Sequence, residues 1–284
     1  MRRVHLFEFT DMAWYPRSFR RIQTDYLQFV ATRGAGHVNL MPLFARALAQ
    51  ARTTEIVDLC SGGTGPWERL REHFKHAGLN VSVTLTDKYP DPEAVTRWAR
   101  TSTDGIEYLA EPVDAMQVPE RLTGMRTLFE GFHHFRPEQA ERILRHAMET
   151  RAAIGVFEAS VKPPLGPIVL VLSPLMTLLG YVFATPFIRP YRLSRLFWTY
   201  AVPLVPLATC WDGAVSLLRV YSVPELQAMA RRLRADGYEW EAGHASTGTP
   251  LFEFTYLIGY PVRSPQSGGA LLGPARAGSG RRMA

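Results

Sequence analysis

A glycine-rich turn between an apolar run and a helix-forming stretch is the feature of this sequence best suited to chemistry. Residues 55–67 read Glu-Ile-Val-Asp-Leu-Cys-Ser-Gly-Gly-Thr-Gly-Pro-Trp. The run at 55–59 has the apolar character of a buried strand, and Pro66 suits the first turn of a helix. Backbone N–H groups then converge with a helix N-terminus where side chains are absent, which suits a nucleotide-like ligand. Because glycine turns also end ordinary strands, this motif alone leaves a structural role open.

Acidic residues at three successive predicted strand ends indicate the same kind of ligand. Asp58 lies at the end of the first strand, Asp87 follows the second and Asp114 follows the third. The carboxyl ends of parallel strands meet at one edge of a sheet. There Asp87 can accept hydrogen bonds from two ribose hydroxyls, and Asp114 suits an adenine amino group. The predicted cofactor-binding residues are Asp58, Ser61, Gly62, Gly63, Gly65, Asp87, Asp114, Ala115 and His133.

Two histidines and a glutamate are the candidates for catalysis. His133 and His134 follow the fourth predicted strand, and Glu158 ends the fifth. A neutral imidazole can take a proton from a hydroxyl, and Glu158 can hold an amine, act as a base or orient a neighbour. The alternative is that one histidine packs against the cofactor and the other is a buried side chain with satisfied hydrogen bonds.

The elements that position these residues alternate along the chain. Strands are predicted at 55–59, 81–86, 106–109, 127–130 and 154–158, with helices at 67–77, 92–101 and 137–150 between them. This alternation is typical of a parallel sheet covered by helices. A helix from Ser222 to about residue 235 and strands at 238–242 and 252–260 complete the prediction.

These residues resemble the motifs of the class I S-adenosylmethionine-dependent methyltransferases. The resemblance covers roughly 50–160 and 222–260. It implies an α/β, Rossmann-like seven-stranded methyltransferase sheet with its last strand antiparallel, S-adenosylmethionine over the carboxyl ends of the first strands, and S-adenosylhomocysteine as product. The loop departs from the commoner form because Cys60 replaces the first glycine and one residue is added before Gly65. The stretches that carry the resemblance are Asp58-Leu-Cys-Ser-Gly-Gly-Thr-Gly65, Asp87, Asp114-Ala115 and Phe132-His-His-Phe135.

Two other classes of protein fit parts of this pattern. An NAD-dependent oxidoreductase shares the glycine turn and the second acidic residue. However, an aspartate before the turn suits the cationic amino end of S-adenosylmethionine and would repel a pyrophosphate. A helix-packing glycine at the dinucleotide spacing is also missing after Gly65. The other alternative is a non-catalytic domain of the same fold that binds the cofactor or a lipid.

The chain divides into three predicted parts. Residues 1–50 form an N-terminal helical lid, 51–262 form the methyltransferase domain with an apolar helical insertion at 160–221, and 263–284 form a basic tail whose composition predicts disorder. Substrate contacts are predicted in the lid and at the end of the insertion, where the alternatives are plain packing and a buried hydrogen-bond network. The predicted substrate-binding residues are Trp14, Tyr15, Asp212, Arg219 and Tyr221.

The insertion is unusually apolar. No charged residue occurs from 163 to 188 or from 196 to 211. Prolines at 163, 164, 167, 174 and 186 favour a broken hairpin over a continuous membrane span. Arg189, Arg192 and Arg195 suit anionic lipid head groups. We therefore predict a monotopic, membrane-dipping segment that admits a hydrophobic small molecule or lipid as acceptor; the alternative is a lid folded onto the domain or onto a second subunit.

Composition limits the remaining function classes. Lys and Arg number 32 against 26 acidic residues in 284, and this charge of +6 is scattered, so nucleic-acid binding is not expected. Two cysteines and an interrupted N-terminus predict a reduced, cytoplasmic protein at the inner membrane face. His73 and His76 have no third ligand nearby in the sequence, so no metal site is expected. The methylated atom and the oligomeric state are not determined by these residues.

Overall fold

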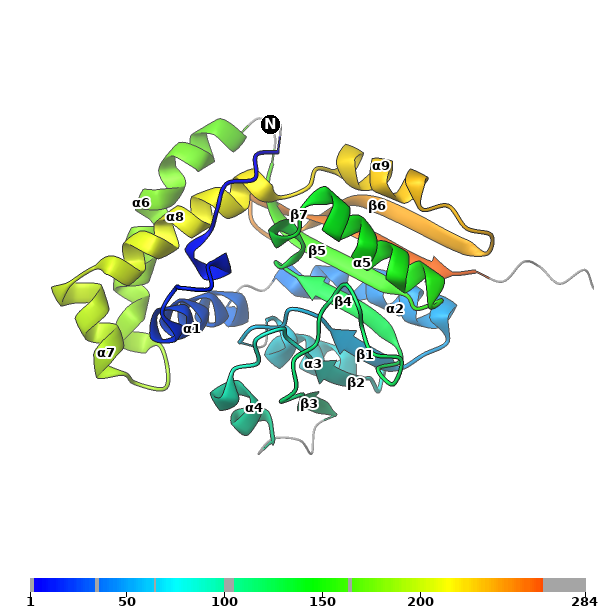
Figure 1. The fold of residues 1–284 in the computed structure, drawn as a ribbon, viewed down its shortest axis with the longest axis horizontal. Coiled ribbons are helices and arrows are strands. Elements are labelled where there is room, and N and C mark those ends of the chain that lie inside the picture. The colour runs from blue at the N-terminus through cyan, green and yellow to red at the C-terminus, as the bar shows by residue number, and fades with distance from the viewer. Residues whose placement is uncertain (1–2, 34–35, 64, 100–104, 163–164, 263–284) are drawn as a thin grey trace, which may run out of the picture.

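A seven-stranded sheet forms the centre of the computed structural model, which describes residues 3–33, 36–63, 65–99, 105–162 and 165–262 (Figure 1). The strand order is β3-β2-β1-β4-β5-β7-β6, and β7 is the one strand among the described residues that runs antiparallel to its neighbours. The sheet predicted from the resemblance is thereby confirmed. The strands are β1 (Glu55–Asp58), β2 (Ser82–Leu85), β3 (Ile106–Tyr108), β4 (Met125–Phe129), β5 (Ile154–Val161), β6 (Tyr238–Ser246) and β7 (Phe252–Pro261).

Helices cover both faces of the sheet because successive strand residues point to opposite sides. In β1, Ile56 packs with the helices of one face, whereas Val57 packs with those of the other. Both faces are therefore buried, as expected for a mainly parallel sheet. The first face carries α2 (Met41–Ala51), α3 (Trp67–His76) and α4 (Pro92–Ala99), and the second carries α5 (Pro137–Glu149) and α9 (Val223–Arg232).

The helix starts follow from local chemistry. Ser222 and Glu225 form a capping box at α9, with Glu225 accepting hydrogen bonds from the backbone N–H and the hydroxyl of Ser222 at 2.9 and 2.6 Å. Proline occupies the first turn of α5, where its missing N–H costs nothing. Both helix starts were predicted. The loops after β4 and β5 lie at one end of the sheet because these two strands are parallel.

The insertion forms an apolar lobe, defined as residues 165–219. It contains α6 (Gly166–Ala184), α7 (Leu193–Leu196) and α8 (Leu204–Arg219), and α6 and α8 pack side by side (Figure 1). The predicted hairpin is present, but the predicted break is wrong because α6 continues through Pro174. Proline leaves the Leu170 carbonyl without its helical N–H donor. The Ser173 hydroxyl donates to that carbonyl at 3.0 Å instead, which satisfies it inside the helix.

The arginines of the lobe are not all available to lipid head groups, which corrects the prediction. Arg195 is 1% exposed and donates to Asp25 at 2.6 Å. Arg192 donates to the same carboxylate at 3.2 Å and pairs with Glu93. Of the three, only Arg189 is exposed, with its guanidinium 3.4 Å from the centre of the Tyr191 ring.

Helix α1 (Arg17–Arg33) joins the lobe to the rest of the chain. The rings of Tyr26 and Tyr181 lie 4.4 Å apart, and the Tyr181 hydroxyl donates to the Ile22 carbonyl at 3.3 Å. Tyr181 is fully buried. The predicted helical lid therefore exists, and it packs on the lobe.

Residues 3–15, here called the N-terminal strap, precede α1 and run along α8 (Figure 1). Val4 N–H donates to the Leu218 carbonyl and Trp211 Nε1–H donates to the Phe7 carbonyl, both at 2.9 Å. The strap thus lies between the lobe and the sheet. The predicted disordered tail at 263–284 lies outside the described residues.

Candidate active site

The glycine loop after β1 adopts the backbone that a ligand-binding turn requires. Cys60, Gly62 and Gly65 have φ values of 58°, 52° and 55°, in the left-handed region that favours glycine. Cys60, which stands where the commoner motif has glycine, keeps the glycine-like conformation. A Cβ atom added at Gly62 or Gly65 would meet nothing within 4 Å, so both residues border open space.

Asp58 stabilises the glycine loop through buried hydrogen bonds. It is 1% exposed, and its two carboxylate oxygens accept hydrogen bonds from the Ser61 and Thr127 hydroxyls, both at 2.6 Å. Burial raises the pKa of Asp58 to about 7, against the opposing effect of these hydrogen bonds. Its predicted contact with the amino end of a cofactor stays a prediction, because the structure directs the carboxylate at the chain's own hydroxyls.

Asp87 and Asp114 lie at the same sheet edge and are partly exposed. Asp87 accepts hydrogen bonds from the Gly62 N–H at 2.9 Å and the Tyr89 N–H at 2.8 Å. Asp114 accepts from the Met116 N–H at 2.9 Å and pairs with a lysine. The predicted strand-end carboxylates are therefore brought together, with Asp87 directly on the glycine loop.

Helix α1 covers part of the glycine loop. Gln28 Nε2 donates to the Gly65 carbonyl at 3.1 Å. A Cβ atom at Gly63 would lie 2.9 Å from Thr24 Cγ2, so only glycine allows the helix this close. Gly63 therefore faces the lid, whereas Gly62 and Gly65 border open space.

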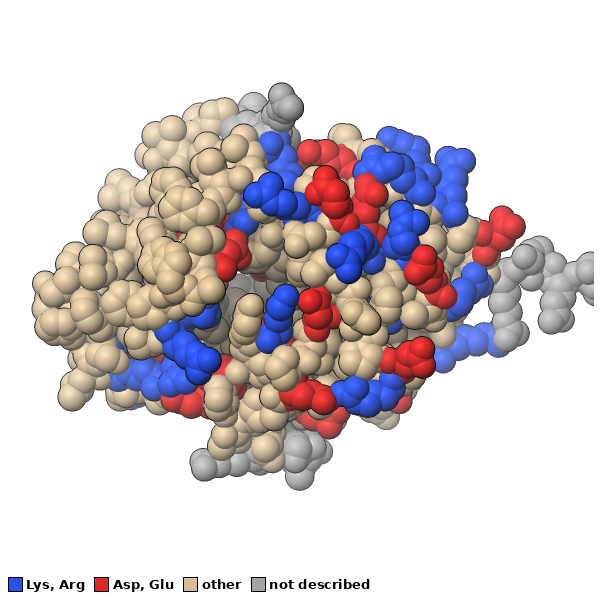
Figure 2. Space-filling model, in the orientation of Figure 1, with Lys and Arg blue, Asp and Glu red and all other residues tan. Residues whose placement is uncertain are grey.

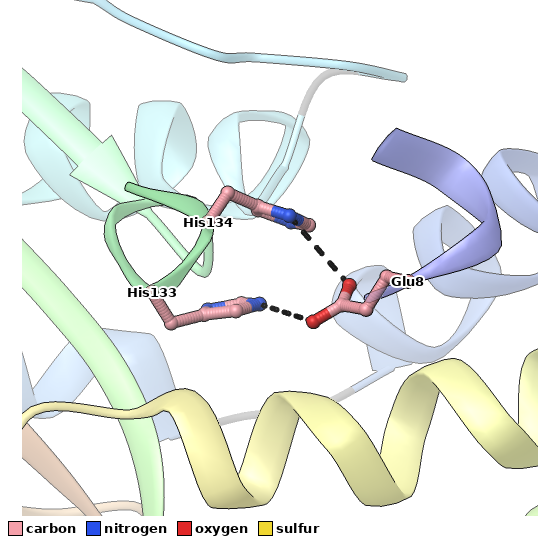
Figure 3. A group of neighbouring side chains, drawn as sticks. All are labelled: Glu8, His133 and His134. Atoms are coloured by element: carbon pink, nitrogen blue, oxygen red, sulfur yellow. Dashed lines mark ion pairs between the residues drawn. The ribbon is translucent and has the colours of Figure 1, made fainter. Parts of the chain in front are cut away.

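His133, in the loop after β4, and Glu158, in β5, form a buried pair. Glu158 was expected to end its strand, but β5 continues to Val161 because its last residues pair with β7. His133 is 4% exposed and Glu158 is 2% exposed, and His133 Nδ1 lies 2.6 Å from Glu158 Oε2. The other oxygen of Glu158 accepts the backbone N–H of Phe132 and of His133. Burial opposes the charge on Glu158, but the His133 interactions outweigh it and lower the pKa of Glu158. His133 Nε2 is buried without a hydrogen-bond partner, 3.8 Å from Glu8 Oε1 (Figure 3).

His134 lies beside His133 and contacts two acids of the strap. Its Nδ1 is 2.8 Å from Asp11 Oδ1 and 3.6 Å from Glu8 Oε2. Burial disfavours the imidazolium, but the Asp11 hydrogen bond and the charges of Glu8 and Asp11 outweigh it, so the pKa of His134 is raised. Burial opposes the charge on Asp11, but its contacts with His134 and Arg219 outweigh burial and lower the pKa of Asp11 to about 2.

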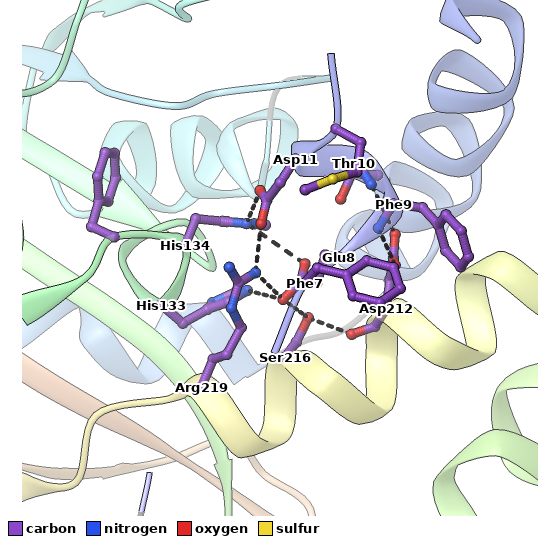
Figure 4. Close-up of polar contacts among 12 residues, drawn as sticks. Phe7, Glu8, Phe9, Thr10, Asp11, His133, His134, Asp212, Ser216 and Arg219 are labelled. Carbon is purple, nitrogen blue, oxygen red and sulfur yellow. Dashed lines mark hydrogen bonds and ion pairs between the residues drawn. The ribbon is translucent and has the colours of Figure 1, made fainter. Parts of the chain in front are cut away.

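Glu8 and Arg219 connect the strap to α8 in the same network (Figure 4). Glu8 is 2% exposed, and Arg219 Nη1 lies 2.7 Å from Glu8 Oε1 and from Asp11 Oδ2. Ser216 also donates to Glu8, at 3.2 Å. Sequence reasoning identified Arg219 but missed Glu8 and Asp11, because the strap has no motif or periodicity that marks them.

The other predicted substrate residues are placed differently. Asp212 accepts the strap N–H groups of Phe9 and Thr10 at 2.7 and 3.2 Å, which agrees with a buried hydrogen-bond network. The Tyr221 hydroxyl donates to a backbone carbonyl in the loop after β4. Trp14 is 68% exposed, whereas Tyr15 is buried with an unpartnered hydroxyl. Substrate contact by these residues stays a prediction.

Glu130 is a second residue that sequence reasoning missed. It directly follows β4 with a φ of 51°, unusual for a residue other than glycine, and both its oxygens accept the Ala159 N–H, at 2.9 and 3.0 Å. This N–H lies beyond the end of β4 and would otherwise lack a partner.

Figure 2 shows the surface hollowed between the apolar lobe and the sheet.

No family model and no curated protein matches the chain. Among solved structures it resembles the citrinin polyketide synthase CMeT domain, with 12% identity and a TM-score of 0.49 over 89% of this chain and 59% of that one. Human N-acetylserotonin methyltransferase in complex with SAM shares 13% identity, with a TM-score of 0.47 over 87% and 57%. A putative zinc-dependent alcohol dehydrogenase from Rhodobacter sphaeroides also shares 13%, with a TM-score of 0.45 over 87% and 98%.

The chain spans only part of several of these proteins, for example 42% of the LepI chain solved with SAM. At such identities the likeness concerns the fold. The strand order with an antiparallel β7 is the observation that defines a Rossmann-like methyltransferase fold here.

Asp58→Asn is expected to flatten the pH dependence of stability. The folded chain keeps the Asp58 proton up to about pH 7, whereas the unfolded chain loses it near pH 4. The contribution of Asp58 to the free energy of unfolding is therefore highest below about pH 4 and falls, by up to a few kcal/mol, as the pH rises to about 7. Denaturant unfolding across this interval measures the slope. The exposed variant Asp236→Asn is the control, and equal slopes in the two variants would contradict the assignment.

Proposed function

We propose that this chain is an S-adenosylmethionine-dependent methyltransferase that acts on a hydrophobic small molecule or lipid. The observation that carries the proposal is the glycine loop, whose Gly62 and Gly65 border open space beside the partly exposed Asp87. Such a site offers backbone donors and a carboxylate for ribose hydroxyls at one sheet edge. Asp114 and Ala115 are placed to contact the adenine.

The acceptor side of the proposed site is the cluster around His133. The cofactor supplies a methyl group on a sulfonium, which a nucleophile displaces directly, so the protein mainly aligns the acceptor and excludes water. His133 Nε2 is a buried ring nitrogen without a hydrogen-bond partner among the described residues, and Glu158 holds the ring from behind. We assign the activation of a protonated acceptor to this atom, with His134 and Arg219 beside it.

The apolar lobe is proposed to rest in a lipid surface. Gly166–Phe187 is 22 residues long, and 17% of its apolar stretch is buried, whereas the core helix of a soluble protein is mostly buried. Large side chains are exposed along the outer faces of both α6 and α8. A second copy of the chain would cover the exposed side chains of one of these faces, whereas lipid would cover those of both. The exposed residues include Ile168, Val171, Leu175, Leu179, Phe183, Leu204, Leu207 and Trp211.

The lobe also explains the class of acceptor. In Figure 2 most of the lobe is tan, with blue and red side chains along its lower edge, whereas Lys, Arg, Asp and Glu are spread over the sheet. The helical stretch Leu193–Ala201, which contains α7, and α8 are bent by 79° relative to each other, which suits helices that lie in a lipid interface better than helices that cross it. The strap and α1 lie between this lobe and the glycine loop.

Asp87→Ala is expected to weaken the binding of S-adenosylhomocysteine about 10- to 100-fold, because a charged acceptor of two hydrogen bonds contributes ~1.5–3 kcal/mol. Calorimetry measures the affinity for S-adenosylhomocysteine and for NAD. Asp91→Ala, four residues further along the same loop, is the control and keeps the affinity. Tight binding of NAD without binding of S-adenosylhomocysteine would refute the proposed function.

Methyl transfer to lipid-soluble molecules is the reaction that we expect. The purified chain is incubated with methyl-labelled cofactor and a total lipid extract, and labelled products are identified by mass spectrometry. His133→Asn should lower the rate by ~100-fold or more, as expected for a group that activates the acceptor. His76→Asn on the exposed surface of α3 should leave it unchanged. Label appearing only in water-soluble products would contradict a lipophilic acceptor.

Flotation with phosphatidylcholine and phosphatidylglycerol vesicles tests the lipid surface. The wild-type chain should float, and Val171→Asp with Phe183→Asp should reduce the bound fraction at least about tenfold, because each buried side chain contributes ~2 kcal/mol. These two residues are 77% and 70% exposed. Tyr89→Asp, at a residue 73% exposed in the loop between β2 and α4, is the matched control. A wild-type chain that stays with the soluble fraction would reject the proposal.

A further inference from the structure

Three side chains from two distant segments converge beside the proposed acceptor site. Glu8 comes from the strap, and His133 and His134 come from the loop after β4 (Figure 3). One ligand atom from each residue lies within 4.8 Å of the other two. Glu8 and His133 are buried, and the His134 side chain is 32% exposed. Two imidazoles and a carboxylate in this arrangement form a recognised set of metal ligands.

The surroundings of His133 point independently to a ligand. Its Nδ1 faces Glu158 at 2.6 Å, which places the ring proton on Nδ1 and leaves a lone pair on Nε2. That Nε2 atom is buried and has no hydrogen-bond partner. A buried acceptor without a donor is costly in a folded chain. A carboxylate behind a histidine whose other nitrogen is free is also the usual arrangement around a metal-binding histidine.

The charges of the cluster favour a cation. Glu8, Asp11 and Glu158 supply three carboxylates, and Arg219 is the guanidinium that contacts Glu8 and Asp11. Even with Arg219 and an imidazolium at His134 counted, the three ionised carboxylates leave negative charge in a place where two of them are 2% exposed. A bound divalent ion would take the place of the His134 proton and neutralise this charge.

We propose that Glu8, His133 and His134 bind one divalent transition-metal ion of the kind that prefers mixed nitrogen and oxygen ligands, such as Zn²⁺, Mn²⁺ or Fe²⁺. The expectation of no metal site considered only His73 and His76 as ligands and did not include Glu8. The role of the ion rests on the proposed function: it would hold an acceptor oxygen and favour loss of its proton, in place of direct proton transfer to His133 Nε2, which would then be a ligand of the ion.

Cobalt titration tests the site without cofactor or acceptor. The full-length, untagged chain is treated with a chelator and titrated with Co²⁺, whose visible absorption reports its ligands. We expect one Co²⁺ per chain, displaced by Zn²⁺. Glu8→Gln and His133→Asn should each weaken binding at least about tenfold, and Glu158→Gln should weaken it ~10- to 100-fold through the His133 ring. The surface pair His73→Asn with His76→Asn is the matched control and should bind as the wild type does.

The outcomes separate this proposal from the proposed function. No Co²⁺ uptake by the wild-type chain, or equal uptake by Glu8→Gln and His133→Asn, would overturn the metal site. S-adenosylhomocysteine affinity, measured on the same preparations, shows that each variant is folded. A chain that binds S-adenosylhomocysteine but no Co²⁺ refutes the metal site alone, whereas one that binds Co²⁺ but no S-adenosylhomocysteine refutes the methyltransferase alone.

Discussion

The buried ion pair between Glu8 and Arg219 is the interaction on which the arrangement of this molecule depends. It joins the strap to α8, and through Asp11, His133 and His134 it extends to the ends of β4 and β5. Removing one partner of a buried pair leaves an uncompensated charge, at a cost of ~3–5 kcal/mol. The lobe, the strap and the sheet are therefore fixed relative to one another by the same groups that border the proposed acceptor site.

Much of the fold follows from local sequence. The strands of the central sheet alternate with amphipathic helices, and the capping box at Ser222 marks α9 clearly. The glycine loop and its strand-end acids could also be predicted, because left-handed backbone and short polar side chains leave a pattern in one stretch of chain. Cys60 shows the limit of this reasoning. It adopts a glycine-like backbone conformation, which could not be predicted from a cysteine side chain.

The parts that sequence reasoning missed depend on contacts between distant segments. Glu8 lies 125 residues from His133 along the chain, in a strap without periodicity, so only the folded structure brings them together. Pro174 was expected to break α6, but Ser173 satisfies the carbonyl that proline leaves free. Arg192 and Arg195 look like a free basic cluster in the sequence, yet Asp25 and Glu93 pair with them. In each case a contact with another residue changes the role that the residue type alone would predict.

Helix α1 contacts both the glycine loop and the apolar lobe. In the same two turns of the helix, Thr24 and Gln28 lie against Gly63 and Gly65 of the glycine loop, whereas Ile22 and Tyr26 contact Tyr181 of the lobe. A helix is stiff along its length, so a shift that a ligand imposes at the loop also moves the surface against which the lobe rests. The two binding events are thermodynamically linked. If a ligand in the glycine loop strengthens docking of the lobe by a given free energy, then docking of the lobe strengthens ligand binding by the same free energy.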